Sequence, residues 1–260
     1  MNRIQTILDK EWAEVFKNRM VIITVALLPV IFTIMPLVVL HFTGSSINGG
    51  GTDLPPSFAA ACGDLPMTDC LQRYIINEFL LFYMIMPVII PITIAAYSIV
   101  GEKTTRSLEP LLATPITTTE LLTGKSLAAT IPGVIATWAS FFLFVVLAPL
   151  AGARPALIAY ALSPTWLLAV LVSGPLMAVL SVNFALFISS RVNDPRVAEQ
   201  ISAVLILPLL LVLFLQIAGI VVLNVFTMLV FILIIAAIDV GMIYLGARLF
   251  QRETILTRWK

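Results

Sequence analysis

The chain has 260 residues, of which 60% are hydrophobic and only 11% are charged, and its mean hydropathy is +1.06. A soluble domain of this size cannot bury so much apolar surface without exposing large patches. The net charge of +1, without a dense basic run, excludes a nucleic-acid partner. The composition therefore predicts an all-α integral membrane protein whose surroundings are the lipid bilayer.

Residues 1–19 precede the first apolar window, and they predict an amphipathic helix. Over residues 4–16 the apolar side chains share one helical face, and most charged side chains lie off that face. We expect this helix to lie in the headgroup plane with Trp12 as an interfacial anchor. The alternative is an ordinary helix that packs on the protein's own cytoplasmic loops.

Long windows without charged residues predict six transmembrane helices, because about 20 apolar residues cross the hydrocarbon core. Pro164 interrupts the fourth window, and the uncharged block from Gln200 to Ile238 is too long for one crossing. That block predicts a helical hairpin that turns near residues 219–224, with a re-entrant piece as the alternative. The predicted helices cover 20–41, 79–100, 124–150, 165–190, 200–220 and 225–247, within a single domain of 1–260.

Lysine and arginine positions predict the orientation, because cytoplasmic loops carry an excess of both. A six-helix chain places all but two of its 15 basic residues on one side, and only Arg73 and Arg154 fall on the other. Both termini are therefore expected in the cytoplasm. We expect a multi-pass protein of the plasma membrane of a prokaryote.

The largest exterior loop, residues 42–77, contains the only two cysteines, Cys62 and Cys70. Thiols on the outer side of a membrane commonly form disulfides. A disulfide here would contribute roughly 2–3 kcal/mol in the chain-entropy model. Zinc binding by two thiolates is the weaker alternative, because no histidine lies nearby, and we predict no metal site.

Catalytic chemistry finds little support in the sequence. His41 is the only histidine, so a histidine-based triad has a single candidate base and no H-E-x-x-H zinc site exists. The run Gly124-Lys125-Ser126 resembles the end of a phosphate-binding loop, but that loop needs a glycine where Thr119 stands. We therefore predict no catalytic residue and no cofactor bound by this chain.

Residues 101–123 form a charged stretch between two apolar windows, which we call the polar segment. Residues 107–114 are compatible with a short helix, because proline is tolerated in a first turn. Leu108, Leu111 and Leu112 would then share one face by their spacing. Thr117 and Glu120 form a predicted capping box at the start of the third transmembrane helix. A solvated connector is the plainer interpretation, but a face of three leucines favours a docking site for another protein.

The polar segment resembles the ABC-2 family of ABC transporter permeases. The motif that carries the resemblance joins the second and third helices in that family, and one position departs from it, because Arg106 stands where glycine is common. Six helices, internal termini and an N-terminal interfacial helix are also compatible with the family. The matching positions are Glu102, Lys103, Ser107, Leu108, Glu109, Pro110, Leu111, Leu112, Ala113, Thr114, Pro115, Glu120, Leu121, Leu122, Gly124 and Lys125.

The resemblance implies that the polar segment is a coupling helix that sits in a groove of a separate cytoplasmic ATPase. ATP and magnesium would then be bound by that partner, and two permease copies would assemble with two ATPase subunits. A second, smaller contact is expected at Asn193, Asp194 and Arg196. The implied ATPase-coupling residues are Glu102, Lys103, Arg106, Leu108, Glu109, Leu111, Leu112, Thr114 and Pro115.

Asp239 is an ionisable residue within the predicted sixth helix, and such residues are functional candidates. It is a candidate for the transport path, and the alternatives are a pair with Arg248, a pair with a helix partner, or snorkelling. We therefore predict a permease subunit that exports substrate by alternating access. The alternative is a membrane scaffold or sensor that recruits a cytoplasmic partner through residues 101–125, whereas an intramembrane enzyme lacks a catalytic pair.

Overall fold

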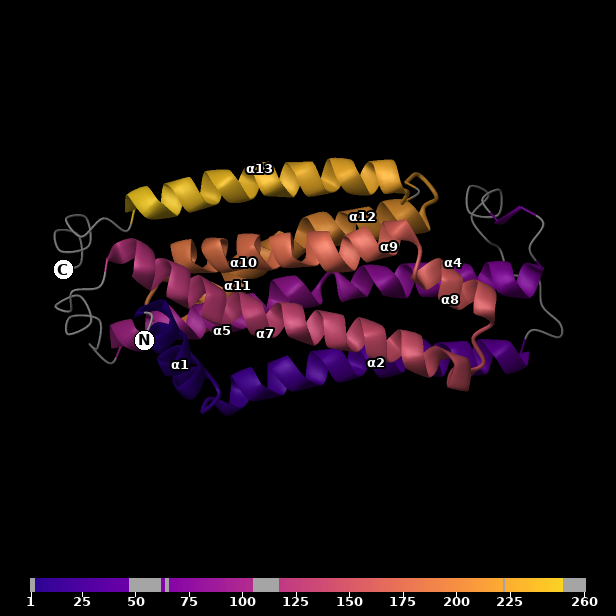
Figure 1. Ribbon diagram of the computed structural model, residues 1–260, viewed down its shortest axis with the longest axis horizontal. Helices are drawn as coiled ribbons and strands as arrows, with labels where there is room; N and C mark the ends of the chain where they lie inside the picture. Colours follow the sequence, from indigo (N-terminus) through magenta and orange to yellow (C-terminus); the bar gives the residue numbers. More distant parts are fainter. Residues whose placement is uncertain (1–2, 47–61, 64–65, 105–116, 222, 250–260) are drawn as a thin grey trace.

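The computed structural model describes residues 3–46, 62–63, 66–104, 117–221 and 223–249, and within these ranges it contains helices and no strand. Six helical stretches are long and apolar enough to cross a membrane. They run side by side along the long axis of an elongated bundle (Figure 1). The protein is therefore an all-α membrane protein with six spans, as predicted. The spans are Val21–Phe42, Asp69–Ser98, Thr119–Ala151, Pro155–Ser189, Pro195–Ile217 and Val225–Gly246.

Several spans consist of more than one helix, because prolines and polar residues interrupt them. The chain begins with α1 (Arg3–Val15), α2 (Arg19–Ser46), α4 (Met67–Tyr83), α5 (Met86–Thr104) and α7 (Thr118–Leu147). It continues with the 3₁₀ helix η1 (Ala148–Ala151), α8 (Pro155–Ala161), α9 (Pro164–Leu168), the π-helix η2 (Ala169–Ser173) and α10 (Gly174–Ser189). It ends with α11 (Pro195–Ser202), the 3₁₀ helix η3 (Ala203–Ile206), α12 (Leu207–Ile217) and α13 (Val225–Leu249).

The span formed by α4 and α5 is the most buried of the six and lies at the centre of the bundle. Helix α5 packs against α7 and α10, and α2 packs against α4, α5 and α7. At the junction of α4 and α5, Tyr83 is fully buried and its ring meets the edge of Phe141 at 6.0 Å between centroids. Pro91 of α5 lies so close to Gly133 of α7 that a Cβ on that glycine would meet the proline ring at 2.5 Å. The α5–α7 contact therefore depends on a residue without a side chain.

The fourth span changes helix type in the middle of the bundle. The π-helix η2 precedes Pro175, which lacks the N–H needed to continue regular α-helical bonding. The indole of Trp138 in α7 donates a hydrogen bond of 3.0 Å to the carbonyl oxygen of Val170 in η2. A side chain from a neighbouring helix thus satisfies a carbonyl at this irregular point, as the interior of a membrane requires.

The second, third and fifth spans extend beyond the charge-free windows, and each contains a charged residue that bonds to a neighbouring helix. Helix α4 begins at Met67 rather than near Phe79. Its Asp69 forms an ion pair of 2.7 Å with Arg154, at the start of α8. The third span likewise begins at Thr119 and contains Lys125, and the fifth begins at Pro195 with α11. The fourth span begins at Pro155, where its charge-free window begins, rather than after Pro164. Hydropathy windows end at a charge, whereas a paired charge does not end a helix.

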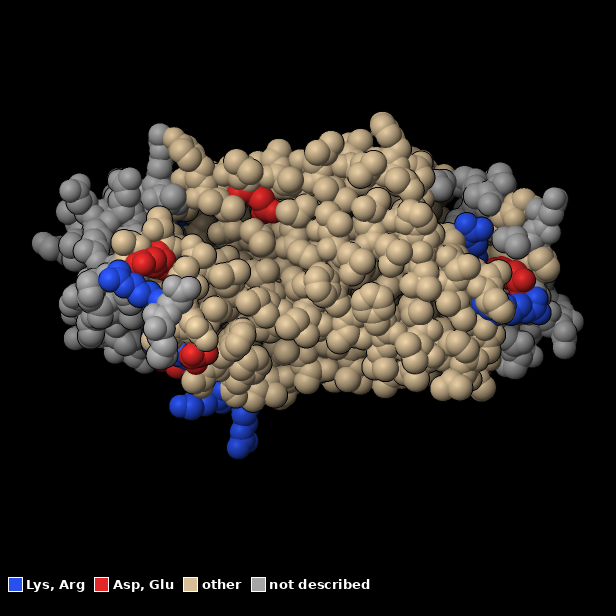
Figure 2. Space-filling model, in the orientation of Figure 1, with Lys and Arg blue, Asp and Glu red and all other residues tan. Residues whose placement is uncertain are grey.

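Most charged residues gather at the two ends of the bundle, and an acidic group shows within the largely uncharged belt between them (Figure 2). We call this the apolar belt, because the bundle exposes many large hydrophobic side chains. Helix α1 lies at the same end as the end of α5 and the start of α7, which it contacts. Arg73 and Arg154 lie at the opposite end, in α4 and at the start of α8. The structure therefore separates these two arginines from the basic residues of α1, as the charge pattern predicts.

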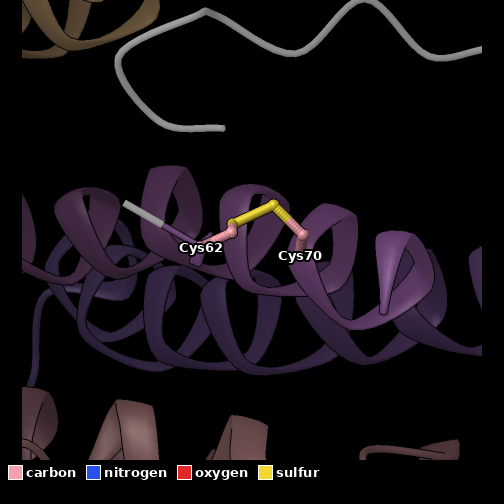
Figure 3. Close-up of a disulfide and its surroundings, with 2 residues drawn as sticks. All are labelled: Cys62 and Cys70. Carbon is pink, nitrogen blue, oxygen red and sulfur yellow. A yellow bond between two sulfur atoms is a disulfide. The ribbon is translucent and has the colours of Figure 1, made fainter. Parts of the chain in front are cut away.

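Cys62 and Cys70 are joined by a disulfide, with 5.7 Å between their Cα atoms (Figure 3). Both residues are buried. Cys70 lies in the first turn of α4, so the bond connects the chain that approaches this helix to the helix itself. Such a bond stabilises the fold chiefly by restricting the unfolded chain.

We expect replacement of both cysteines by serine to lower the free energy of unfolding by about 2–3 kcal/mol, because the short loop between them is no longer closed. Thermal unfolding of the purified protein in detergent measures this loss. Mass spectrometry after thiol alkylation provides an independent measurement. If both thiols of the native protein react before a reductant is added, the disulfide is absent from the folded protein.

Candidate functional site

The structure describes both flanks of the polar segment, but not its centre. Residues 105–116 lie outside the described residues, and with them the predicted contacts Arg106, Leu108, Glu109, Leu111, Leu112, Thr114 and Pro115. Glu102 and Lys103 belong to the last turn of α5, although their side chains are not described. The site is therefore built from the helices that hold the two ends of this segment.

The second flank begins with a capping box at the start of α7, which confirms the sequence prediction. The Thr117 hydroxyl accepts a hydrogen bond from the backbone N–H of Glu120, and the Glu120 carboxylate accepts one of 2.8 Å from the backbone N–H of Thr117. These bonds satisfy two backbone donors at the helix start. Arg3 of α1 lies 3.6 Å from the same carboxylate. The residue at which α7 begins is thus set by the capping box and by a contact with Arg3 of α1.

Three polar side chains connect α1 to both flanks of the polar segment. The Lys125 ammonium of α7 donates hydrogen bonds to the Glu11 carboxylate of α1, at 2.7 Å, and to the Ser98 hydroxyl of α5, at 2.8 Å. The Ser98 hydroxyl in turn donates to the second oxygen of Glu11, at 2.5 Å. We call this arrangement the Glu11–Ser98–Lys125 network. Its two charged side chains are each only 3% exposed.

The burial of these two charges decides how much the network matters. Removing an ion pair from water is costly, and the cost is offset only when geometry is good and further hydrogen bonds satisfy both groups. Here each of the three groups bonds to the other two, so the charges are held by short, charge-assisted bonds. An exposed pair of the same type would contribute little. The network therefore acts as a specific connection between α1, α5 and α7.

Close packing between α1 and α7 surrounds the network. The indole of Trp12 donates a hydrogen bond of 3.0 Å to the carbonyl oxygen of Ala128. Ile7 lies directly over Gly124, where an added Cβ would come within 2.7 Å of the isoleucine Cγ2 atom. The predicted apolar face of residues 4–16 thus packs on the protein itself, and Trp12 makes a protein contact rather than serving as a membrane anchor alone.

The predicted second contact lies beside the first flank. Asp194 caps α11, since its carboxylate accepts a hydrogen bond of 2.8 Å from the backbone N–H of Arg196. Asn193 and Arg196 are exposed. Ala198 of α11 is fully buried against the last turns of α5, and Thr93 of α5 donates a hydrogen bond of 2.6 Å to Glu199. Helix α5 therefore connects the two predicted contact regions.

Asp239 lies on α13, away from this site, and is only 4% exposed. Neither of its carboxylate oxygens has a hydrogen-bond partner among the described residues. Met242 and Gly246 follow it at helical spacing on the same face, and both line a cleft of about 280 Å³ between α7, α10 and α13. We call this the α7–α10–α13 cleft, and Asn183 is among its lining residues.

Sequence reasoning missed the Glu11–Ser98–Lys125 network. The sequence marks Lys125 as a cytoplasmic charge, as part of an incomplete phosphate-binding-loop match and as a position of the family motif, whereas Ser98 lies inside an apolar window. One signal was present: Glu11 lies four residues from both Ile7 and Val15, so it interrupts the buried face of α1. An acidic residue on an apolar face indicates a basic partner, but the sequence does not say which of 15 basic residues it is.

The chain matches the family described as ABC-2 family transporter protein over residues 5–249. It belongs to the ABC-2 transporter family. The match extends from α1 through α13, so it includes the α1 contacts as well as the membrane spans. The chain is therefore a transporter permease, a membrane component of transport and not itself a catalyst. No curated protein matches the chain.

We expect replacement of Lys125 by methionine to lower the free energy of unfolding of the permease by about 3–5 kcal/mol, because Glu11 is left buried without its cation. Replacement of Glu11 by leucine in the same chain should recover most of this loss, since no unpaired charge remains. Thermal unfolding in detergent compares the variants. The exposed Lys17 provides the control, and its replacement by methionine should change little. Equal stability of the Lys125→Met variant and the wild type would contradict the role of the network.

We expect Gly124→Ala to lower the free energy of unfolding by about 1–3 kcal/mol, because the new Cβ overlaps Ile7 and displaces α1 from α7. The loss should be smaller when Ile7 is replaced by alanine in the same chain, so a double-mutant cycle measures the contact. Gly241→Ala is the matched control, because nothing lies within 4 Å of a Cβ there. Additive effects of the two substitutions would show that the helices do not meet at this point.

Proposed function

We propose that this permease is the membrane subunit of an ATP-driven exporter and that a separate cytoplasmic ATPase drives it through the polar segment. The observation that carries the proposal is the Glu11–Ser98–Lys125 network, which connects α1 to the helices on both sides of that segment. A solvent-exposed loop that merely connects two helices does not need those helices to be held to a third helix. Here buried charges hold them to α1, which supports a mechanical role for the segment.

The network suggests how a force on the polar segment reaches the membrane spans. A partner that moves the segment moves the last turns of α5 and the first turns of α7 together, because both are bonded to α1. Helix α5 is the second half of the central span and packs on α7 and α10. A displacement at the polar segment is therefore passed directly to the middle of the bundle, where it biases one arrangement of the spans over another.

The partner supplies the nucleotide chemistry in this proposal. ATP and magnesium bind to the ATPase subunits, and the permease binds no cofactor. Two permease copies and two ATPase subunits form the transporter, and alternating access moves the substrate outward. Asn193 and Arg196, exposed at the start of α11, form the second contact with the ATPase. Helix α11, which begins beside these side chains, packs on α5 through Ala198, so a force on this contact is also passed to α5.

We place the α1 end of the bundle in the cytoplasm. Arg3, Lys10, Lys17, Arg19, Lys125, Arg191 and Arg196 belong to this end, whereas Arg73 and Arg154 belong to the other. An excess of basic residues on the cytoplasmic side is the usual arrangement in membrane proteins. The disulfide between Cys62 and Cys70 then lies on the outer side, where such bonds persist.

The α7–α10–α13 cleft is our candidate for the start of the transport path. It opens beside the first turns of α7, close to the polar segment, and its lining combines apolar side chains with Thr119, Thr123 and Asn183. Asp239 lies about one turn further along the same face of α13. Its carboxylate is buried and has no hydrogen-bond partner among the described residues. Such burial is costly in an apolar setting, which supports a role with substrate.

We expect Leu111→Asp or Glu109→Lys to abolish association with the ATPase, while the permease still inserts into the membrane. An aspartate on the leucine face cannot be buried in an apolar groove, and a lysine at 109 reverses a charge beside it. The measurement is the ATP hydrolysis that co-purifies with affinity-tagged permease from native membranes, compared at equal permease yield.

Ala113→Asp is the matched control, because residue 113 lies off the leucine face of the expected helix and the new charge stays in solvent. Wild-type ATP hydrolysis in the Leu111→Asp preparation would contradict the proposal. Transport into membrane vesicles with and without ATP separates an exporter from a scaffold, since a scaffold retains its partner and moves nothing.

A further inference from the structure

A second polar site lies at the end of the bundle opposite α1. A cavity of about 280 Å³ lies between the start of α4 and α8, which also contact each other. We call it the α4–α8 cavity. Its polar lining consists of Asp69, Gln72, Arg73 and Arg154, and its apolar lining consists of Ala156, Leu157 and Ala159. Nothing in the proposed coupling to an ATPase uses these residues.

Two guanidinium groups line the α4–α8 cavity, and each is held in place. Arg154 donates a hydrogen bond of 2.7 Å to the Asp69 carboxylate. Arg73 lies over the ring of Tyr160, with 4.1 Å from its central carbon to the ring centroid. The Tyr160 hydroxyl donates a hydrogen bond of 2.5 Å to Asn77. The stacking fixes the plane of the Arg73 guanidinium, and Arg73 also interacts with the Tyr160 hydroxyl. A guanidinium has five N–H donors, more than one hydroxyl can accept, so donors remain for a ligand in the cavity.

Gln72 places a buried polar group at the wall of the α4–α8 cavity. Its side chain lines the cavity and is only 5% exposed. Its amide oxygen has no hydrogen-bond partner among the described residues. A buried amide without a partner destabilises the protein, so it calls for a ligand or water that satisfies it. The amide presents both a donor and an acceptor, and it lies one residue before Arg73.

We propose that the α4–α8 cavity binds the phosphate group of an anionic phospholipid. The planar donor forks of Arg73 and Arg154 match the oxygens of a phosphate. Among the lining residues, two cations face one carboxylate, so an anion is favoured. The Gln72 amide oxygen then accepts a hydrogen bond from a headgroup hydroxyl.

The position of the α4–α8 cavity favours a lipid over a free anion. Charged residues meet the apolar belt of the bundle at this end (Figure 2), which is the level of the headgroups for a protein whose spans cross the membrane. Ala156, Leu157 and Ala159 supply a small apolar wall, along which the glycerol and the first acyl carbons of a lipid can lie. A free phosphate would use the arginines and leave this wall without a partner.

Nanodiscs test the proposal with defined lipids. We expect the melting temperature of the wild-type permease to be higher in nanodiscs that contain phosphatidylglycerol than in nanodiscs of phosphatidylcholine alone. We expect Arg73→Gln and Gln72→Leu to reduce that difference by at least half, because each removes a ligand contact. Lys17→Gln, which removes an exposed cation at the opposite end, should leave the difference unchanged. Native mass spectrometry should show retained phosphatidylglycerol on the wild type and less on Arg73→Gln.

A second arm separates a lipid from a free anion. Inorganic phosphate is added to the permease in a neutral detergent without lipid. Stabilisation by inorganic phosphate that is lost in Arg73→Gln supports an oxyanion site at this cavity with a soluble occupant. An unchanged lipid effect in both Arg73→Gln and Gln72→Leu, or an equal loss in Lys17→Gln, overturns the proposal. Neither arm measures ATP hydrolysis or transport, so the outcome is independent of the proposed function.

Discussion

The buried ion pair between Glu11 and Lys125 is the constraint on which the functional end of this permease depends. Charges in an apolar interior are tolerated only where partners are fixed, and here Ser98 completes a closed set of three bonds. The set can form only if α1, α5 and α7 meet at one point. It therefore specifies the position of an N-terminal helix whose apolar face alone would allow many positions.

The rest of the α1 end of the bundle is arranged around that point. Gly124 lets α1 approach α7 closely, and Trp12 satisfies a carbonyl of α7 while it packs. On the other side of α5, the small residue Ala198 lets α11 approach. Small residues thus let the helices approach closely, and polar groups then form hydrogen bonds between them. Helices in membranes commonly associate in this way. The result is a frame of four helices around the two ends of the polar segment.

The two ends of the molecule use charge differently. At the α1 end, Glu11 and Lys125 are removed from solvent and paired, so they hold helices in place. At the opposite end, Arg73 and Arg154 remain partly accessible beside an unsatisfied amide, so they are available to a ligand.

The sequence by itself determined the class, the six spans and the capping box at Thr117, because these depend on hydropathy and on bonds between neighbouring residues. It did not determine where spans begin, because Asp69 is kept inside a helix by a partner 85 residues away. It identified the apolar face of α1 but not the helix on which that face packs. It also contained no signal that Ser98 bonds to two charged residues. Only the tertiary structure decided that Glu11 meets Lys125, because that contact depends on distances between helices that no local pattern encodes.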